Sequence, residues 1–182
     1  MTTNTSTNTN TNLSAKFTLN GALWVVQVLG GCFFAGSGFG KVLLADGALY
    51  ESAPRAVAWY AAVPQPLIVF IGVAEVLGGI GLILPALTRI RPVLTPLAGL
   101  GLAVTMLLAA VFHVVRGEYE LVPANIVLGG IAALVAAGRR NVRPVAPGRL
   151  TTPRLLGSAA VMAVMILLVF APTWYTMTHA QF

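Results

Sequence analysis

Glu75 is the residue whose type and position most clearly suggest chemistry. It lies in the middle of residues 64–85, a stretch that has no other charged residue and is long enough to cross a bilayer. A carboxylate at that depth costs on the order of a few kcal/mol or more, so it must be paired, protonated or turned toward a polar cavity. Gly72, Gly78 and Gly79 lie three or four residues away on the same helical face, where small residues let another helix approach closely. The pattern predicts that Glu75 points into a helix bundle.

Other polar side chains belong to the ends of neighbouring apolar segments. Lys41 closes the first segment, His113 lies near the end of the third, Asn125 lies near the start of the fourth, and Gln65 opens the second. We expect Glu75 and His113 to exchange protons with a bound small molecule, since histidine titrates near neutral pH. Lys41, Asn125 and Gln65 would orient that molecule. Each of these residues also has a purely structural interpretation. In that interpretation Lys41 extends its side chain to the membrane surface, His113 is a structural residue at the membrane boundary, and Asn125 hydrogen-bonds a neighbouring backbone group.

The composition predicts the elements that position these residues. The chain has 182 residues, of which 57% are hydrophobic and 9% charged, whereas soluble domains carry about a quarter charged residues. We therefore expect an all-α integral membrane protein, with a four-helix transmembrane bundle plus a fifth C-terminal transmembrane helix. The expected spans are residues 21–44, 64–84 (closed by Pro85), 93–115, 121–138 and 155–175. The expected domains are a disordered Thr/Asn-rich cytoplasmic tail (1–20), a membrane domain (21–138), a basic cytoplasmic linker (139–154) and the fifth helix with a short outer tail (155–182).

The basic residues predict an orientation in the membrane. Eight of them fall on the side of the N-terminus and three on the other side; the eight are Lys16, Arg89, Arg91, Arg139, Arg140, Arg143, Arg149 and Arg154. Because Lys and Arg collect on the cytoplasmic side, we expect the N-terminus inside and the C-terminus outside. The net charge of +6 does not indicate nucleic-acid binding, since the arginines lie between apolar spans and form no basic face with interleaved aromatics. The expected partner is the lipid bilayer.

The other candidate motifs of the sequence do not indicate a phosphate, thiol or metal site. The run 36–41 resembles a phosphate loop but lacks its first glycine and its Ser/Thr, so Gly36 and Gly40 are interpreted as a G-x-x-x-G surface for packing or self-association. Cys32 is the only cysteine, which excludes an internal dithiol relay. One histidine and one carboxylate in the second and third spans fall short of a metal ligand set. We expect no metal and no covalent cofactor.

Three segments resemble the DoxX family of small bacterial membrane proteins. They are residues 30–41, the motif Gly72-x-x-Glu75-x-x-Gly78-Gly79 followed by Leu82 and Leu84, and the sequence MLLAAVFH at 106–113. The resemblance covers about residues 20–140. Family members often have an arginine early in the first span, where this chain has Gln27, and the fifth span lies outside the usual four-helix pattern.

The resemblance implies a four-helix bundle of the bacterial inner (plasma) membrane that is associated with redox functions. The family is named after a subunit of a thiosulfate:quinone oxidoreductase, and other members are linked to thiol-redox complexes. The resemblance implies that Lys41, Glu75 and His113 are the functional positions, and it suggests a quinone as the redox cofactor. We expect a membrane subunit of a quinone-linked or thiol/sulfur redox system with a soluble or membrane redox partner. The alternatives are a proton-coupled small-solute carrier and a non-catalytic anchor for a soluble enzyme; no residue establishes catalysis by this chain itself.

Overall fold

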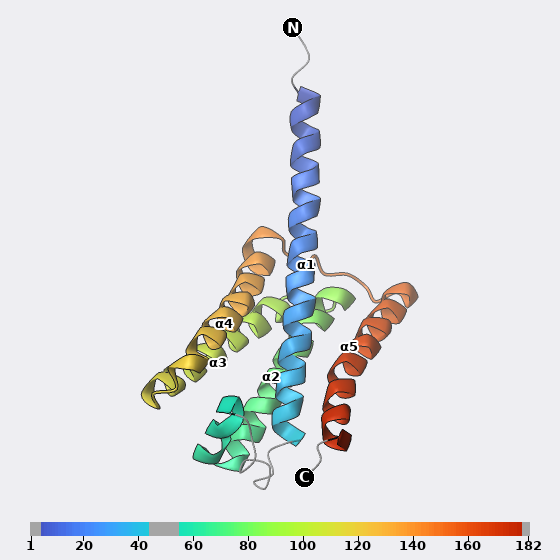
Figure 1. The fold of residues 1–182 in the computed structure, drawn as a ribbon. Helices are drawn as coiled ribbons and strands as arrows, with labels where there is room; N and C mark the ends of the chain where they lie inside the picture. Colours follow the sequence, from blue (N-terminus) through green and yellow to red (C-terminus); the bar gives the residue numbers. More distant parts are fainter. Residues whose placement is uncertain (1–4, 44–54, 180–182) are drawn as a thin grey trace.

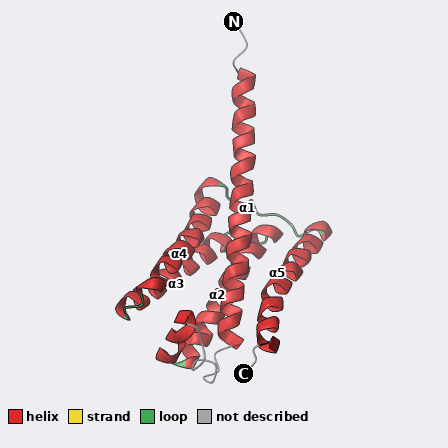
Figure 2. Cartoon of the chain, viewed as in Figure 1, coloured by secondary structure: helices red, strands yellow, loops and turns green. Residues whose placement is uncertain are grey.

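The computed structural model describes residues 5–43 and 55–179, and within them the side chains of residues 19–43 and 58–167. Every element in these ranges is helical (Figures 1 and 2). In chain order they are α1 (Thr5–Leu43), the 3₁₀ helix η2 (Arg55–Ala62), α2 (Gln65–Thr88), α3 (Leu94–Val115), η3 (Tyr119–Leu121), α4 (Val122–Ala137), the π-helical turn η4 (Gly138–Val142) and α5 (Thr152–His179).

The helices have the length and composition of membrane spans. Four stretches of the described chain are apolar and long enough to cross a bilayer: Leu19–Leu43, Gln65–Thr88, Leu94–Val115 and Tyr119–Val142. Large apolar side chains such as Phe70, Leu77 and Leu107 are more than half exposed. In a helix bundle of this composition such a surface faces lipid. The predicted all-α membrane bundle is confirmed, and the chain is a multi-pass membrane protein.

The bundle is organised around α1, which packs against α2, α4 and α5. Figure 1 shows α1 between α5 and the pair formed by α3 and α4. Phe34 of α1, Leu82 and Ile83 of α2, and Leu102 of α3 share one buried core with Met165 of α5. The fifth helix is therefore part of the same packed unit.

Glycines bring α1 and α2 into backbone contact. A Cβ atom on Gly31 would lie 2.9 Å from the carbonyl oxygen of Gly79, and a Cβ on Gly72 would lie 2.7 Å from that of Gly38. Each helix contributes two glycines seven residues apart, which fall on one face of a helix. Only residues without a side chain allow two helices to approach this closely.

The other glycines predicted for helix packing lie elsewhere. Gly78 faces α3, where a Cβ would lie 2.6 Å from Leu102 Cδ2. Gly40 has nothing within 4 Å of the position of a Cβ, and Gly36 is half-buried. The face of α1 that meets α2 thus passes through Gly31 and Gly38, and Gly40 makes no close contact within the described residues.

Two helix boundaries differ from the predicted ones. Pro85 was expected to close the second span, but it lies inside α2, which continues to Thr88. Membrane helices tolerate an internal proline when neighbouring helices support them, and Ile83 and Ala86 on either side of it are buried. The first helix begins at Thr5, within the predicted polar tail, where no proline or glycine interrupts residues 5–20.

Candidate functional site

A cavity of about 450 Å³ opens at the end of the bundle where α1 and α3 finish. We call this the Lys41 end. The cavity is lined by residues from α1, η2, α2, α3 and α4, and most of them are apolar or aromatic. Lys41, Glu75, His113 and Asn125 all line it, so each of the four helices contributes one of the predicted polar groups.

Lys41 and Glu75 form an ion pair on this wall. Lys41 Nζ lies 2.7 Å from Glu75 Oε2 and donates a second hydrogen bond, also 2.7 Å long, to Ser37 Oγ. The Glu75 side chain is 2% exposed and that of Lys41 is 11% exposed. The pair depends on the close approach of the two helices, because Gly38 lies one turn before Lys41 and faces Gly72. The deep carboxylate is thus both paired and turned toward a cavity.

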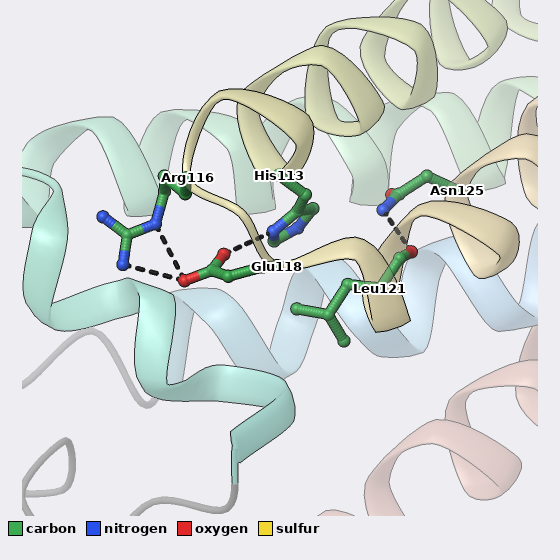
Figure 3. Close-up of polar contacts among 5 residues, drawn as sticks. All are labelled: His113, Arg116, Glu118, Leu121 and Asn125. Carbon is green, nitrogen blue, oxygen red and sulfur yellow. Dashed lines mark hydrogen bonds and ion pairs between the residues drawn. The ribbon is translucent and has the colours of Figure 1, made fainter.

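His113 is held by a residue that the sequence analysis did not single out. His113 Nδ1 lies 2.7 Å from Glu118 Oε2. Arg116 donates a hydrogen bond from Nε to Glu118 Oε1 at 2.8 Å, and its Nη2 forms an ion pair with the same oxygen, also at 2.8 Å (Figure 3). With a carboxylate as its partner, Nδ1 carries the proton of the ring, and Nε2 remains to meet a ligand. His113 is buried, and the rings of Trp59 and Phe112 lie edge-on to it at 6.0 and 5.4 Å.

The backbone at the end of α3 explains this pairing. Gly117 has a φ of 74°, and its N–H bonds to the carbonyl of Val114 while the N–H of Glu118 bonds to that of His113. This is the Schellman arrangement, which places the second residue after a helix beside the helix's last turn. The sequence signal that could have identified this carboxylate is Gly117, just after the apolar helix that carries His113 in its last turn, with Glu118 following it.

Asn125 and Gln65 differ in their relation to the cavity. Asn125 Nδ2 donates to the carbonyl of Leu121 at 2.9 Å (Figure 3), which leaves Oδ1 as the group that can accept a hydrogen bond from a ligand. Gln65 is exposed and does not line the cavity. It lies ten residues before Glu75, which corresponds to about 15 Å along the helix and to a different face.

The cavity also reaches the lipid-facing surface. Four of its lining residues are at the same time substantially exposed on the outside of the bundle; they are Phe33, Leu67, Phe70 and Leu108. All four are apolar. A ligand that enters between them has to be soluble in the membrane.

The Glu118 contacts predict a dependence of stability on pH. The hydrogen bond from Arg116, followed by that from His113, holds the pKa of Glu118 below its usual range. A carboxyl with a lowered pKa in the folded state adds stability above its unfolded pKa of about 4.3, and this contribution is lost as pH falls through the folded pKa. Wild type should therefore melt at a higher temperature than Glu118→Gln near pH 6. The difference should shrink below about pH 4.3 in thermal melts of the purified protein. An unchanged difference at low pH would contradict the assignment.

The family comparison covers the part of the chain that builds this site. The model of the DoxX-like family matches residues 25–135, which include all four polar groups of the cavity. No curated protein and no solved structure matched the chain significantly.

Proposed function

Since the chain belongs to the DoxX-like family, we propose that it is a membrane subunit of a quinone-linked redox system and that its cavity binds the quinone head group. The observation that carries this proposal is a cavity that combines an apolar opening toward lipid with the Lys41–Glu75 ion pair and with a histidine on its wall that is held from outside the cavity by the carboxylate of Glu118. A water-soluble substrate would need a polar entrance instead. The lipid-side opening therefore favours a quinone over the small solute of a carrier.

The lining fits a quinone head group in shape and in polarity. Ligand cavities of roughly 300–1,000 Å³ are typical for molecules of this size class, and this one measures about 450 Å³. A quinone ring is flat and apolar and carries carbonyl oxygens on opposite sides. Trp59 and Phe112 would contact the ring, and Lys41 would donate to one carbonyl oxygen. His113 Nε2 would accept from the hydroxyl that the other oxygen becomes in the reduced form, the quinol.

A bound quinone supplies two-electron, two-proton redox chemistry, and the chain's residues handle the protons. His113 Nε2 can accept a proton from a hydroxyl on the ligand, and the carboxylate of Glu118 stabilises the resulting imidazolium. Glu75 can exchange a proton on the opposite wall, with Lys41 balancing its negative charge. Asn125 Oδ1 would fix the orientation of a ligand hydroxyl.

The electrons must pass between the quinone and a partner, since the single cysteine Cys32 cannot form an internal dithiol. They leave to the partner when His113 takes a proton from the quinol, and they arrive from it when the proton is returned to the quinone. We place the protein in a bacterial plasma membrane with its N-terminus in the cytoplasm, because the loops at the Arg139 end hold most of the arginines. The cavity would then open in the outer half of the membrane. A redox partner would meet the protein at that side.

The proposal is tested by the quinone that stays bound to protein purified in mild detergent. Organic extraction and mass spectrometry should find quinone in wild type and up to about tenfold less in His113→Gln, since a hydrogen bond between neutral groups contributes about 0.5–1.5 kcal/mol. Gln65→Ala is the matched control, because Gln65 lies outside the cavity and its replacement should leave the quinone content unchanged.

Three other results would overturn or redirect the assignment. Equal quinone in wild type and His113→Gln would mean that the cavity does not hold it. Proton-coupled uptake of a solute by vesicles containing the protein, without bound quinone, would support the carrier. A stable soluble partner retained at the arginine-rich end, again without quinone, would support the anchor.

A further inference from the structure

The second buried polar cluster lies at the opposite end of the bundle, around Arg139. This residue is 3% exposed and belongs to the π-helical turn that follows α4. Its Nε donates to Gln27 Oε1 at 2.6 Å, its Nη1 donates to Asn20 Oδ1 at 2.9 Å, and its guanidinium lies 4.7 Å from the centre of the Trp24 ring. All three partners are neutral.

Part of this guanidinium has no partner. Arg139 Nη2 is buried and makes no hydrogen bond within the described residues. The same is true of Nε of Arg143, four residues later. An unpaired buried donor costs about 1–3 kcal/mol, and more when it is charged. Two such donors, four residues apart in the sequence, point to a missing acceptor.

Among the described residues, no carboxylate fills that role. The five acidic residues of the chain all fall between positions 46 and 120. Glu75 and Glu118 are paired at the Lys41 end, and Glu120 is exposed within η3. Asp46 and Glu51 lie outside the described residues. The Arg139 end instead gathers arginines from the loop after α2, from η4, from the linker that follows it and from the first turn of α5; they are Arg89, Arg91, Arg139, Arg140, Arg143, Arg149 and Arg154.

We propose that Arg139 and Arg143 form a binding site for a phosphate group. A guanidinium is planar and offers parallel N–H donors that match two phosphate oxygens. The site lies at the end of the apolar stretch Tyr119–Val142, the level at which basic pockets between membrane helices bind lipid head groups. Residues 143–151 form no regular element and are exposed or half-buried, so an anion can approach from that side.

Native mass spectrometry of the full-length protein in mild detergent tests the site. The probes are phosphatidylglycerol, zwitterionic phosphatidylcholine and inorganic phosphate. Wild type should bind phosphatidylglycerol in preference to phosphatidylcholine, and Arg139→Gln should weaken that binding at least about tenfold. Arg140→Gln removes the same charge from an exposed neighbour and should weaken it no more than about fivefold, the effect of one surface arginine.

A second variant covers the case in which Arg139→Gln does not fold. Arg139→Lys keeps the positive charge but loses the parallel N–H donors of the guanidinium. This variant should therefore bind phosphatidylglycerol more weakly than Arg140→Gln does. Competition by millimolar inorganic phosphate would identify a soluble phosphate as the source, and its absence a phospholipid; both results support the site. If Arg139→Lys and Arg140→Gln bind phosphatidylglycerol equally well, Arg139 is satisfied by its neutral partners and the proposal is wrong.

Discussion

Replacing Glu75 with glutamine is expected to lower the free energy of unfolding by about 3 kcal/mol, the lower end of the range for breaking one partner of a buried ion pair. The lower end applies because Lys41 keeps 11% of its side chain exposed and faces the cavity. Glutamine has nearly the same volume as glutamate, so the packing around it is retained and the lost term is electrostatic. Reversible unfolding in mixed detergent micelles measures the change.

A double-mutant cycle separates the pair from its surroundings. Lys41→Met alone should also destabilise the protein, because it leaves the carboxylate of Glu75 without its counter-charge. The double variant Lys41→Met/Glu75→Gln should be more stable than the sum of the two single changes predicts, by about 1–3 kcal/mol. Additive effects would mean that the two side chains do not interact in the folded protein.

The stability effect of Glu75→Gln also sets a condition for experiments on binding. Quinone retention by this variant has to be compared at a temperature where it is still folded. His113→Gln is the cleaner test of the cavity, because His113 can be replaced without leaving a charge unpaired inside the membrane. Its partner Glu118 is 22% exposed and keeps its bonds to Arg116.

The sequence predicted the membrane helices and the grouping of polar residues because both follow from local rules. Each apolar helix is long enough to cross the membrane once, and successive helices run in opposite directions. The end of the first span, the end of the third and the start of the fourth therefore lie on the same side of the membrane. Glu75 needed a partner at its depth, and Lys41 had the only long basic side chain on the first span. These constraints suffice to bring Lys41, Glu75, His113 and Asn125 to one cavity.

Contacts that depend on rotation about the helix axes could not be predicted in the same way. Gly36 and Gly40 fit the G-x-x-x-G spacing, but the face of α1 that meets α2 is set by all its neighbours together and passes through Gly31 and Gly38. The hydrogen bond from Arg139 to Gln27 joins residues 112 positions apart. Nothing in the local sequence of either helix specifies that contact.

Gly38 offers the sharpest test of the packing that positions the site. A Cβ atom on Gly38 would overlap the carbonyl oxygen of Gly72 and lie 2.8 Å from Glu75 Cβ. The obstacles are backbone atoms and the first atom of a buried side chain, so α1 and α2 would have to separate. Gly38→Ala should lower the free energy of unfolding by about 3 kcal/mol, the upper part of the range for overpacking, in the same detergent assay.

Gly40→Ala is the matched control, two residues along the same helix. Nothing lies within 4 Å of a Cβ at that position, and alanine is a better helix former than glycine by about 1 kcal/mol. The two variants should therefore change stability in opposite directions although the chemical change is the same. Separation of the helices would also draw Lys41 away from Glu75, so the coupling energy of that pair should shrink in the Gly38→Ala background and persist in Gly40→Ala. Equal stabilities, or an unchanged coupling in Gly38→Ala, would show that the ion pair does not depend on the glycine contact between the two helices.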